Sequence, residues 1–181
     1  MERARDGRYE GAVPVLETAR LRLRAHRSED HAARTAIWSD PEIMRYLGGR
    51  PLTGEEVWRR QLQFIGLWNL LGYGYWAVEE KDTGHYIGDV GFADFHRDMQ
   101  PSLVGMLEFG WVLAPRAHGK GYASEAVAAA ISWGGRHFGS LRAVCIIDPA
   151  NLPSIRVAEK AGFKLWQEAT YRDAPTLVFS R

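Results

Sequence analysis

The sequence predicts one domain of the α+β class, built on a mixed, mostly antiparallel central sheet. Three successive segments, residues 75–80, 86–95 and 103–113, read as strands, with a short polar turn or loop between them. Strands that follow one another so closely form an antiparallel meander. The third segment is followed by a long helical pattern and then by the apolar run 141–147. Such a strand–helix–strand unit forms a parallel pair with a right-handed crossover.

The composition limits the function classes that need to be considered. The 181 residues suit one domain with a sizeable core, and 46% apolar with 25% charged residues is an ordinary globular mixture. A net charge of +1 gives no basis for a nucleic-acid or membrane partner. No apolar run approaches the ~20 residues of a membrane span, and the charged first ten residues lack the apolar core of a signal peptide. We therefore expect a cytoplasmic location.

The first segment of the chain predicts a tail, a strand and a helix. Residues 1–13 are polar and are expected to form a loose tail ahead of a single domain over residues 14–181. Residues 20–24 alternate strictly between arginine and leucine, which predicts a half-buried strand. Ser28 can then cap a helix that runs to Trp38.

Two more helical segments are predicted before the meander. Residues 41–46 begin with a proline and favour a short helical turn. Thr53 and Glu56 have the spacing of a capping box, which predicts a helix that continues through Leu71. The apolar positions expected to face the core are Val57, Leu62, Ile65, Trp68 and Leu71.

The segment after the third meander strand, residues 116–123, carries the strongest functional signal. It reads Arg-Ala-His-Gly-Lys-Gly-Tyr-Ala and opens a helical pattern that ends at Gly139. The start of a helix offers unpaired N–H groups and a positive dipole, which together bind anions such as phosphate. Gly119 and Gly121 leave the backbone accessible to a ligand, and Arg116 adds a cation.

Two common nucleotide motifs do not fit this loop. A Walker loop needs a serine or threonine after its lysine, whereas Gly121 follows Lys120. A Rossmann fingerprint needs a third glycine at the position that Ser124 occupies. An ordinary tight turn before a helix stays open as an alternative for the two glycines alone.

The last part of the chain predicts a second short helix and two strands. Asn151 can cap a helix that has Pro153 in its first turn and ends at Gly162. Residues 163–171 and 176–179 then read as the final strands. Cys145, the single cysteine, lies in the apolar strand 141–147, so we expect a buried, inert thiol rather than a nucleophile or part of a disulfide framework.

Four segments in the correct order resemble the GNAT superfamily of N-acetyltransferases. The loop at residues 116–123 looks like the acyl-coenzyme A pyrophosphate loop of that superfamily. Residues 16–24 and 39–47 resemble the first two landmarks of the branch that includes the ribosomal-protein N-terminal acetyltransferases. The segment 151–163, with its Asn-x-x-Ser and Glu-Lys-x-Gly-Phe patterns, resembles the third.

The resemblance implies a fold and a cosubstrate. Relatives have an α+β fold with helices on both faces of the sheet, which splays between the fourth and fifth strands, here residues 103–113 and 141–147. The pantetheine arm of acetyl-CoA lies in that splay and pairs with strand backbone. The residues of this chain that would hold acetyl-CoA are then Val112, Leu113, Arg116, Gly119, Lys120, Gly121, Tyr122, Ala123, Asn151 and Ser154. Within this set, the N–H groups of Gly119, Gly121 and Tyr122 would hold the pyrophosphate, and the backbone of Val112 or Leu113 would hold the acetyl carbonyl.

The resemblance also implies an acetyl transfer to a primary amine, and three residues are candidates for catalysis. Glu108 could be the general base if burial raises its pKa. A glutamate that only faces solvent is an equal alternative for this position. Glu168 is the second candidate for the base. Ser154 could protonate the leaving thiolate, because Ala158 replaces the tyrosine that many relatives use; alternatively it only bonds helix backbone. Asn151 is expected near the pantetheine or the reaction centre.

The acceptor and the assembly are less defined by the sequence. Trp38 and Tyr46, with Phe92, are candidates for the acceptor pocket, because the first two helices cover that side in relatives. The histidines lack metal-ligand spacing, so we expect no metal. His118 is expected to be a solvated loop residue rather than a phosphate contact. Relatives occur as monomers and homodimers, and both states remain open. A non-catalytic coenzyme A-binding or sensor protein with the same fold is the alternative function.

Overall fold

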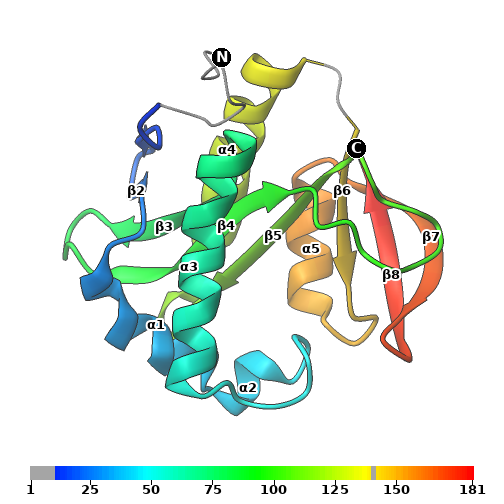
Figure 1. The fold of residues 1–181 in the computed structure, drawn as a ribbon, viewed down its shortest axis with the longest axis horizontal. Helices are drawn as coiled ribbons and strands as arrows, with labels where there is room; N and C mark the ends of the chain where they lie inside the picture. The colour runs from blue at the N-terminus through cyan, green and yellow to red at the C-terminus, as the bar shows by residue number, and fades with distance from the viewer. Residues whose placement is uncertain (1–10, 140–141) are drawn as a thin grey trace.

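The computed structural model describes residues 11–139 and 142–181, and within them the chain forms one sheet of eight strands (Figure 1). The order across the sheet is β1-β2-β3-β4-β5-β6-β8-β7. The strands are β1 (Leu16–Glu17), β2 (Leu21–Arg24), β3 (Tyr75–Glu80), β4 (Tyr86–Ala93), β5 (Leu107–Leu113), β6 (Ala143–Ile147), β7 (Lys164–Tyr171) and β8 (Ala174–Ser180). The expectations of a loose tail over residues 1–10 and of a strand start at residue 141 lie outside the described residues.

Helices cover both faces of this sheet, as expected. They are α1 (His31–Trp38), α2 (Pro41–Met44), α3 (Gly54–Leu71), α4 (Tyr122–Phe138) and α5 (Leu152–Lys160), with 3-10 turns at Ser28–Asp30 and Pro115–Ala117. One core cluster joins α4 and α5 to one face and includes Trp68 from the end of α3, and a second joins α1, α2 and the start of α3 to the other. In Figure 1, α3 crosses in front of the sheet and α4 lies behind it. In the described part of the chain, no helix is long and apolar enough to cross a membrane.

The predicted meander and the predicted parallel pair are both confirmed. Strands β3, β4 and β5 are antiparallel neighbours, and β5 is parallel to β6. The β5–β6 pairing is restricted to two positions, Leu107 with Ala143 and Glu108 with Val144. Beyond Glu108 the two strands therefore diverge, and the remainder of β5 keeps one unpaired edge. The splay implied by the family resemblance is confirmed between these strands.

Local signals set most helix ends correctly. The Thr53 hydroxyl accepts a hydrogen bond from the Glu56 N–H, and the Glu56 carboxylate accepts one from the Thr53 N–H, so the predicted capping box is confirmed. The predicted core stripe of α3 is only partly right. Leu62 and Ile65 are exposed, whereas Gln61 is buried on the same side as Val57. The strand predicted over residues 103–113 is too long at its start, since β5 begins at residue 107.

The core between the sheet and α4 is aromatic, which explains several of the tryptophans. The ring of Trp76 on β3 packs edge-on against Trp68 of α3 and Trp133 of α4, with centroid distances of 4.8 and 5.3 Å. Phe92 of β4 packs in the same cluster, 4.5 Å from Phe109 of β5. This cluster fixes α4 against the sheet and so fixes the position of the glycine loop that precedes α4.

Candidate active site

A cleft of about 890 Å³ lies along the opened edge between β5 and β6 and continues toward α1, α2 and α3. It is more than twice the size of the other cavity described below. Residues of β5, β6, α3 and the start of α5 line it, together with the loops after α2 and after β4. It brings together most of the predicted site residues outside the glycine loop, namely Trp38, Tyr46, Glu108, Val112, Asn151 and Ser154.

The glycine loop has the geometry that an anion site requires. Gly119 and Gly121 have φ angles of 73° and 80°, a backbone conformation that residues other than glycine rarely adopt. A Cβ on Gly119 would meet nothing within 4 Å, so the space beside this backbone is open. Gly121 is the N-cap of α4, no side chain caps that end, and the first helical bond is donated by Glu125. The N–H groups of Tyr122 and Ala123 consequently lack a helical partner.

The two cations of the loop are arranged differently. Arg116 donates from Nη2 to the carbonyl of Tyr86 at 3.0 Å, and half of its side chain is exposed. Lys120 is exposed, and its carbonyl accepts a hydrogen bond from Arg20 at 2.9 Å. Both cations therefore remain accessible to an anion at the start of α4. His118 is not simply solvated, because its Nε2 lies 2.9 Å from the carbonyl oxygen of Leu113.

The alternation of β5 decides which backbone groups face the splay. The Ala114 N–H donates to the carbonyl of Ile87 in β4 at 2.8 Å. In an antiparallel pair this places the peptide groups of Val112 toward β4 and those of Trp111 and Leu113 toward the opposite, open edge. Of the two residues expected to hold an acetyl carbonyl, Leu113 thus has suitable backbone and Val112 does not. Trp111 was missed because the sequence alone does not set the register.

Glu108 lies in the cleft but has a partner that the sequence did not indicate. Its side chain is buried, which excludes the solvent-facing alternative. Both carboxylate oxygens accept hydrogen bonds from Arg97, from Nε at 2.7 Å and from Nη2 at 2.6 Å. Burial raises the pKa of Glu108 above its ordinary value, although Arg97 acts in the opposite direction. Glu168, the reserve candidate, is exposed on β7 and does not line the cleft.

The start of α5 presents Asn151 and Ser154 to the cleft. Asn151 is the N-cap, and its Oδ1 accepts a hydrogen bond from the Ser154 N–H at 3.2 Å. The Ser154 hydroxyl makes no hydrogen bond with another described residue, so the alternative of a serine that bonds helix backbone does not hold. Ala158 is fully buried on the side of α5 that packs against the core, and a tyrosine would not fit there without displacing core residues.

The predicted acceptor residues separate into two groups. Trp38 and Tyr46 line the cleft, and the Trp38 indole donates from Nε1 to Asp89 at 3.1 Å. Asp89 is fully buried and also lies 2.9 Å from Nε2 of His26. The expectation for Phe92 is wrong, because its ring is completely buried in the aromatic core on the other face of the sheet. The strand period allowed either face, and the sequence did not distinguish them.

Two arginines of the cleft were also missed. Arg97 lies in the loop after β4, with its guanidinium over the rings of Phe95 and Tyr171, at 4.9 and 4.8 Å from their centroids. Arg60 lies on α3, with its guanidinium 4.3 Å from the centroid of the Trp38 ring. A polar residue beside the buried stripe of a helix is only a weak sequence signal for such a position.

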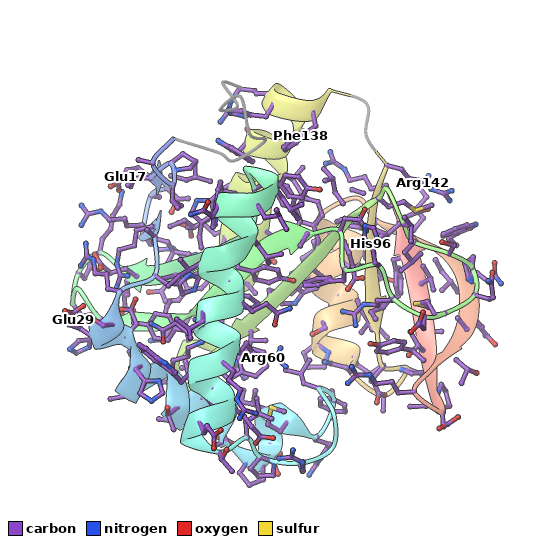
Figure 2. The ribbon with its side chains drawn as sticks, viewed as in Figure 1. Glu17, Glu29, Arg60, His96, Phe138 and Arg142 are labelled. Atoms are coloured by element: carbon purple, nitrogen blue, oxygen red, sulfur yellow. The ribbon has the colours of Figure 1, made fainter. Side chains whose placement is uncertain are left out.

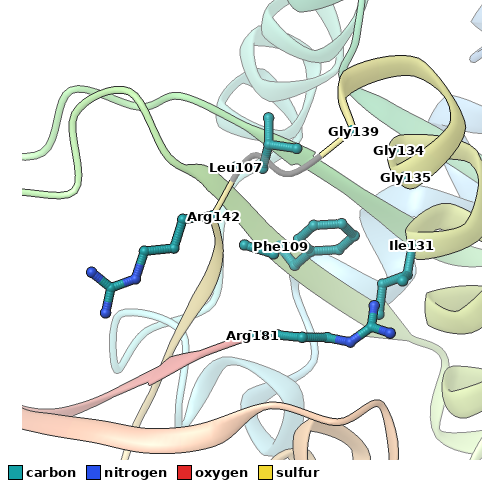
Figure 3. Close-up of a pocket in the computed structure, with 9 residues that line it drawn as sticks. Leu107, Phe109, Ile131, Gly134, Gly135, Gly139, Arg142 and Arg181 are labelled. Atoms are coloured by element: carbon teal, nitrogen blue, oxygen red, sulfur yellow. The ribbon is translucent and has the colours of Figure 1, made fainter.

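A smaller cavity, of about 400 Å³, lies near the end of α4 (Figure 3). Leu107 and Phe109 of β5, Ile131 of α4 and two arginines, Arg142 and Arg181, line it. Figure 3 shows Arg181 extending toward Ile131, whereas Arg142 points away from it. None of the predicted site residues lines this cavity, so the larger cleft is the candidate active site.

Comparisons with known proteins show the family to which the chain belongs. Residues 20–164 match the family model of the acetyltransferase (GNAT) domain. The chain is 33% identical over 162 residues to p20, an uncharacterized N-acetyltransferase of Bacillus licheniformis, over 89% of this chain and 87% of that protein.

Solved structures are similar over nearly the whole chain. A GNAT-family acetyltransferase from Bordetella pertussis superposes with a TM-score of 0.81 at 28% identity, over 93% of this chain and 99% of that one. The ribosomal L7/L12 alpha-N-protein acetyltransferase RimL, in complex with coenzyme A, superposes with a TM-score of 0.75 over 93% of this chain and 97% of that one. Its identity is 18%, so this second likeness concerns the fold.

Proposed function

The chain belongs to the GNAT acetyltransferase domain family, and we propose that it transfers the acetyl group of acetyl-CoA to a primary amine. The observation that carries the proposal is the splay of β5 from β6, which opens beside the glycine loop at the start of α4. A ligand with a pyrophosphate at one end and an amide-bearing arm at the other matches these two features in order.

The residues of the cleft and of the adjoining glycine loop fit acetyl-CoA. The N–H groups at Gly119, Gly121 and Tyr122 would hold the pyrophosphate, with Arg116 and Lys120 as additional cations. The backbone groups of Trp111 and the N–H of Leu113 on the open edge would pair with the amide-bearing arm and the acetyl carbonyl, whereas the Leu113 carbonyl already lies 2.9 Å from Nε2 of His118. The coenzyme A complex of RimL, which shares this fold, supports the assignment. When bound, acetyl-CoA would supply the acetyl group as an activated thioester.

Direct attack of the amine on the thioester in a ternary complex is the mechanism that these residues support. A lysine amine is neutral in about one molecule in 2,500 at pH 7, whereas an α-amine is neutral about a tenth of the time. A base is therefore useful in both cases and more necessary for lysine. Glu108 is our candidate, since each of its oxygens keeps a second lone pair beside the bond to Arg97. Ser154 is the candidate donor to the leaving thiolate, and Asn151 would orient the arm beside it.

Titration calorimetry with acetyl-CoA, and with ATP as the control, tests the coenzyme site. We expect micromolar binding of acetyl-CoA and none of ATP. Coenzyme A release in the presence of a panel of primary amines then tests the transfer. Tight coenzyme binding without transfer to any amine would favour the alternative of a sensor protein. Absence of acetyl-CoA binding would contradict the proposal.

A further inference from the structure

Arg60 is a cation in the cleft without an anionic partner. It is half-buried, lines the cleft, and lies on the side of α3 that faces α5 (Figure 2). It forms no ion pair and no hydrogen bond with any residue in ranges 11–139 and 142–181. Its one direct side-chain contact among the described residues is the stacking on Trp38, 4.3 Å from guanidinium carbon to ring centroid. A desolvated cation without a counter-charge is costly, and a ligand anion would remove that cost.

The other charges around Arg60 are already paired with one another. Arg97 pairs with Glu108, and Arg34 lies 3.1 Å from Asp89. Arg60 and Arg97 line the cleft and Arg34 is buried behind it, beside Asp89. Three arginines therefore accompany two carboxylates, and Arg60 is the surplus positive charge, in neither ion pair. Burial is the main cause of a lowered Arg60 pKa, and Arg34 and Arg97 act in the same direction, whereas Tyr75 and Asp89 act against it.

Two further carboxylates line the cleft, but neither neutralises Arg60. Asp98 is exposed in the loop after β4. Asp148 accepts a hydrogen bond from the Ala150 N–H at 2.8 Å, at the turn between β6 and α5. Neither carboxylate forms an ion pair with Arg60, so neither compensates its positive charge.

The guanidinium is held in place by its surroundings. The Trp38 ring on which it stacks is itself fixed by the hydrogen bond from Nε1 to the buried Asp89. Stacking over an aromatic face leaves the edge of a guanidinium free to donate two parallel hydrogen bonds. That fork matches the two oxygens of a carboxylate.

We propose that Arg60 binds a carboxylate of the acceptor, so that the acceptor is a primary amine that also carries a carboxylate. This inference rests on the proposed acetyl transfer and narrows its substrate class. A free amino acid and a peptide with an acidic side chain near its N-terminus share this chemistry. A polyamine lacks it, and the surplus cation would repel one.

The experiment measures coenzyme A release for pairs of amines that differ only in a carboxylate. One arm compares free amino acids with their amides, and a second compares N-terminal tripeptides having Asp or Glu at position two or three with those having Asn or Gln. We expect at least one acid member to exceed its amide partner in kcat/KM by about tenfold or more, equivalent to about 1.4 kcal/mol. The arm in which this preference occurs identifies the source of the carboxylate.

Variants then assign the preference to Arg60. Arg60→Gln should reduce the acid-to-amide ratio to near one, and Arg60→Lys should retain part of it. Arg45→Gln is the matched control, because Arg45 lines the same cleft but is exposed and paired with Glu42. It should leave the ratio unchanged. Acetyl-CoA affinity, measured by calorimetry for each variant, confirms that the fold is intact.

The results separate this inference from the proposed function. Transfer that favours amides or polyamines, or that shows no acid preference in either arm, overturns the role of Arg60 while the acetyltransferase assignment stands. A preference that survives Arg60→Gln overturns it as well. Failure to bind acetyl-CoA would instead reject the proposed function itself.

Discussion

The carboxylate of Glu108 and the guanidinium of Arg97 form a two-point ion pair inside the cleft, with N–O distances of 2.7 and 2.6 Å. Glu108 is on β5 and Arg97 is in the loop after β4, so the pair ties that loop to the sheet at the point where β5 and β6 begin to diverge. The pair also sets the protonation of the proposed base, because burial raises the pKa of Glu108 and Arg97 opposes that rise.

The first prediction concerns the pH dependence of transfer. In Arg97→Gln the opposing cation is lost, so the pKa of Glu108 should rise further. A base is active when deprotonated, and the acidic limb of the kcat/KM profile should therefore move to higher pH. The profile is measured from pH 5 to 9 with acetyl-CoA saturating. Arg172→Gln, at another arginine of the cleft, should leave the limb in place. An unchanged limb in Arg97→Gln would argue that Glu108 is not the base.

The second prediction separates backbone strain from ligand binding in the glycine loop. Gly119 and Gly84 have nearly the same φ angle, 73° and 69°, and a Cβ on either meets nothing within 4 Å. Alanine at each position should lower the free energy of unfolding by a similar amount, about 1–2 kcal/mol. Only Gly119→Ala should weaken acetyl-CoA binding, by about tenfold or more, because its Cβ would stand beside the backbone N–H groups that we propose hold the pyrophosphate.

Denaturation and calorimetry on the two variants test this comparison. Gly84 lies in the hairpin turn between β3 and β4, away from the start of α4. Equal losses of acetyl-CoA affinity in both variants would mean that the effect comes from stability, and the pyrophosphate assignment would lose its support.

The third prediction concerns the buried carboxylate behind Trp38. Burial acts to raise the pKa of Asp89, but Arg34, His26 and the Trp38 indole outweigh it and hold that pKa below the ordinary value. A depressed native pKa gives stability that is present above the unfolded-state pKa and is lost as the pH falls through the native one. Asp89→Asn should therefore destabilise the protein at pH 7, by about 3–5 kcal/mol, because a buried cation is left unpaired.

Urea denaturation at several pH values measures this effect. The difference between Asp89→Asn and the natural protein should shrink as the pH falls below about 4, because Asp89 is then protonated in the unfolded chain and, at still lower pH, in the folded protein as well. Asp98→Asn is the control, since Asp98 lines the same cleft but is exposed. A pH-independent difference would show that packing rather than charge carries the role of Asp89.

The fourth prediction tests Ser154 as the proton donor. Asn151 caps α5 through the backbone N–H of Ser154, so Ser154→Ala leaves that cap in place. We expect kcat to fall by about a hundredfold while acetyl-CoA affinity changes little. Asn151→Ala should instead cost about 1 kcal/mol of stability through the lost cap. Steady-state kinetics with thermal unfolding distinguishes the two, and a normal kcat in Ser154→Ala would assign proton donation to another group or to water.

Much of the fold could be predicted because its signals are local. The capping box at Thr53 and Glu56, the cap at Asn151, and the glycines before α4 act over a few residues, and the structure has each helix where these signals place it. The parallel β5–β6 pair follows from chain order and from the handedness of crossover connections. The family resemblance then identified the splay between these strands, and the pairing confirms it.

The composition of the site could be predicted only in part, for a physical reason. Glu108 and Ser154 lie on elements that the sequence locates, and both line the cleft. The partner of Glu108 comes from a loop with no periodic pattern, and Phe92 belongs to the core because the pleat turns it away from the cleft. Local patterns determine which residues form a helix or a strand. Only the tertiary structure decided which face each side chain occupies and that Arg60 is left without a carboxylate, because those outcomes depend on contacts between residues distant in the sequence.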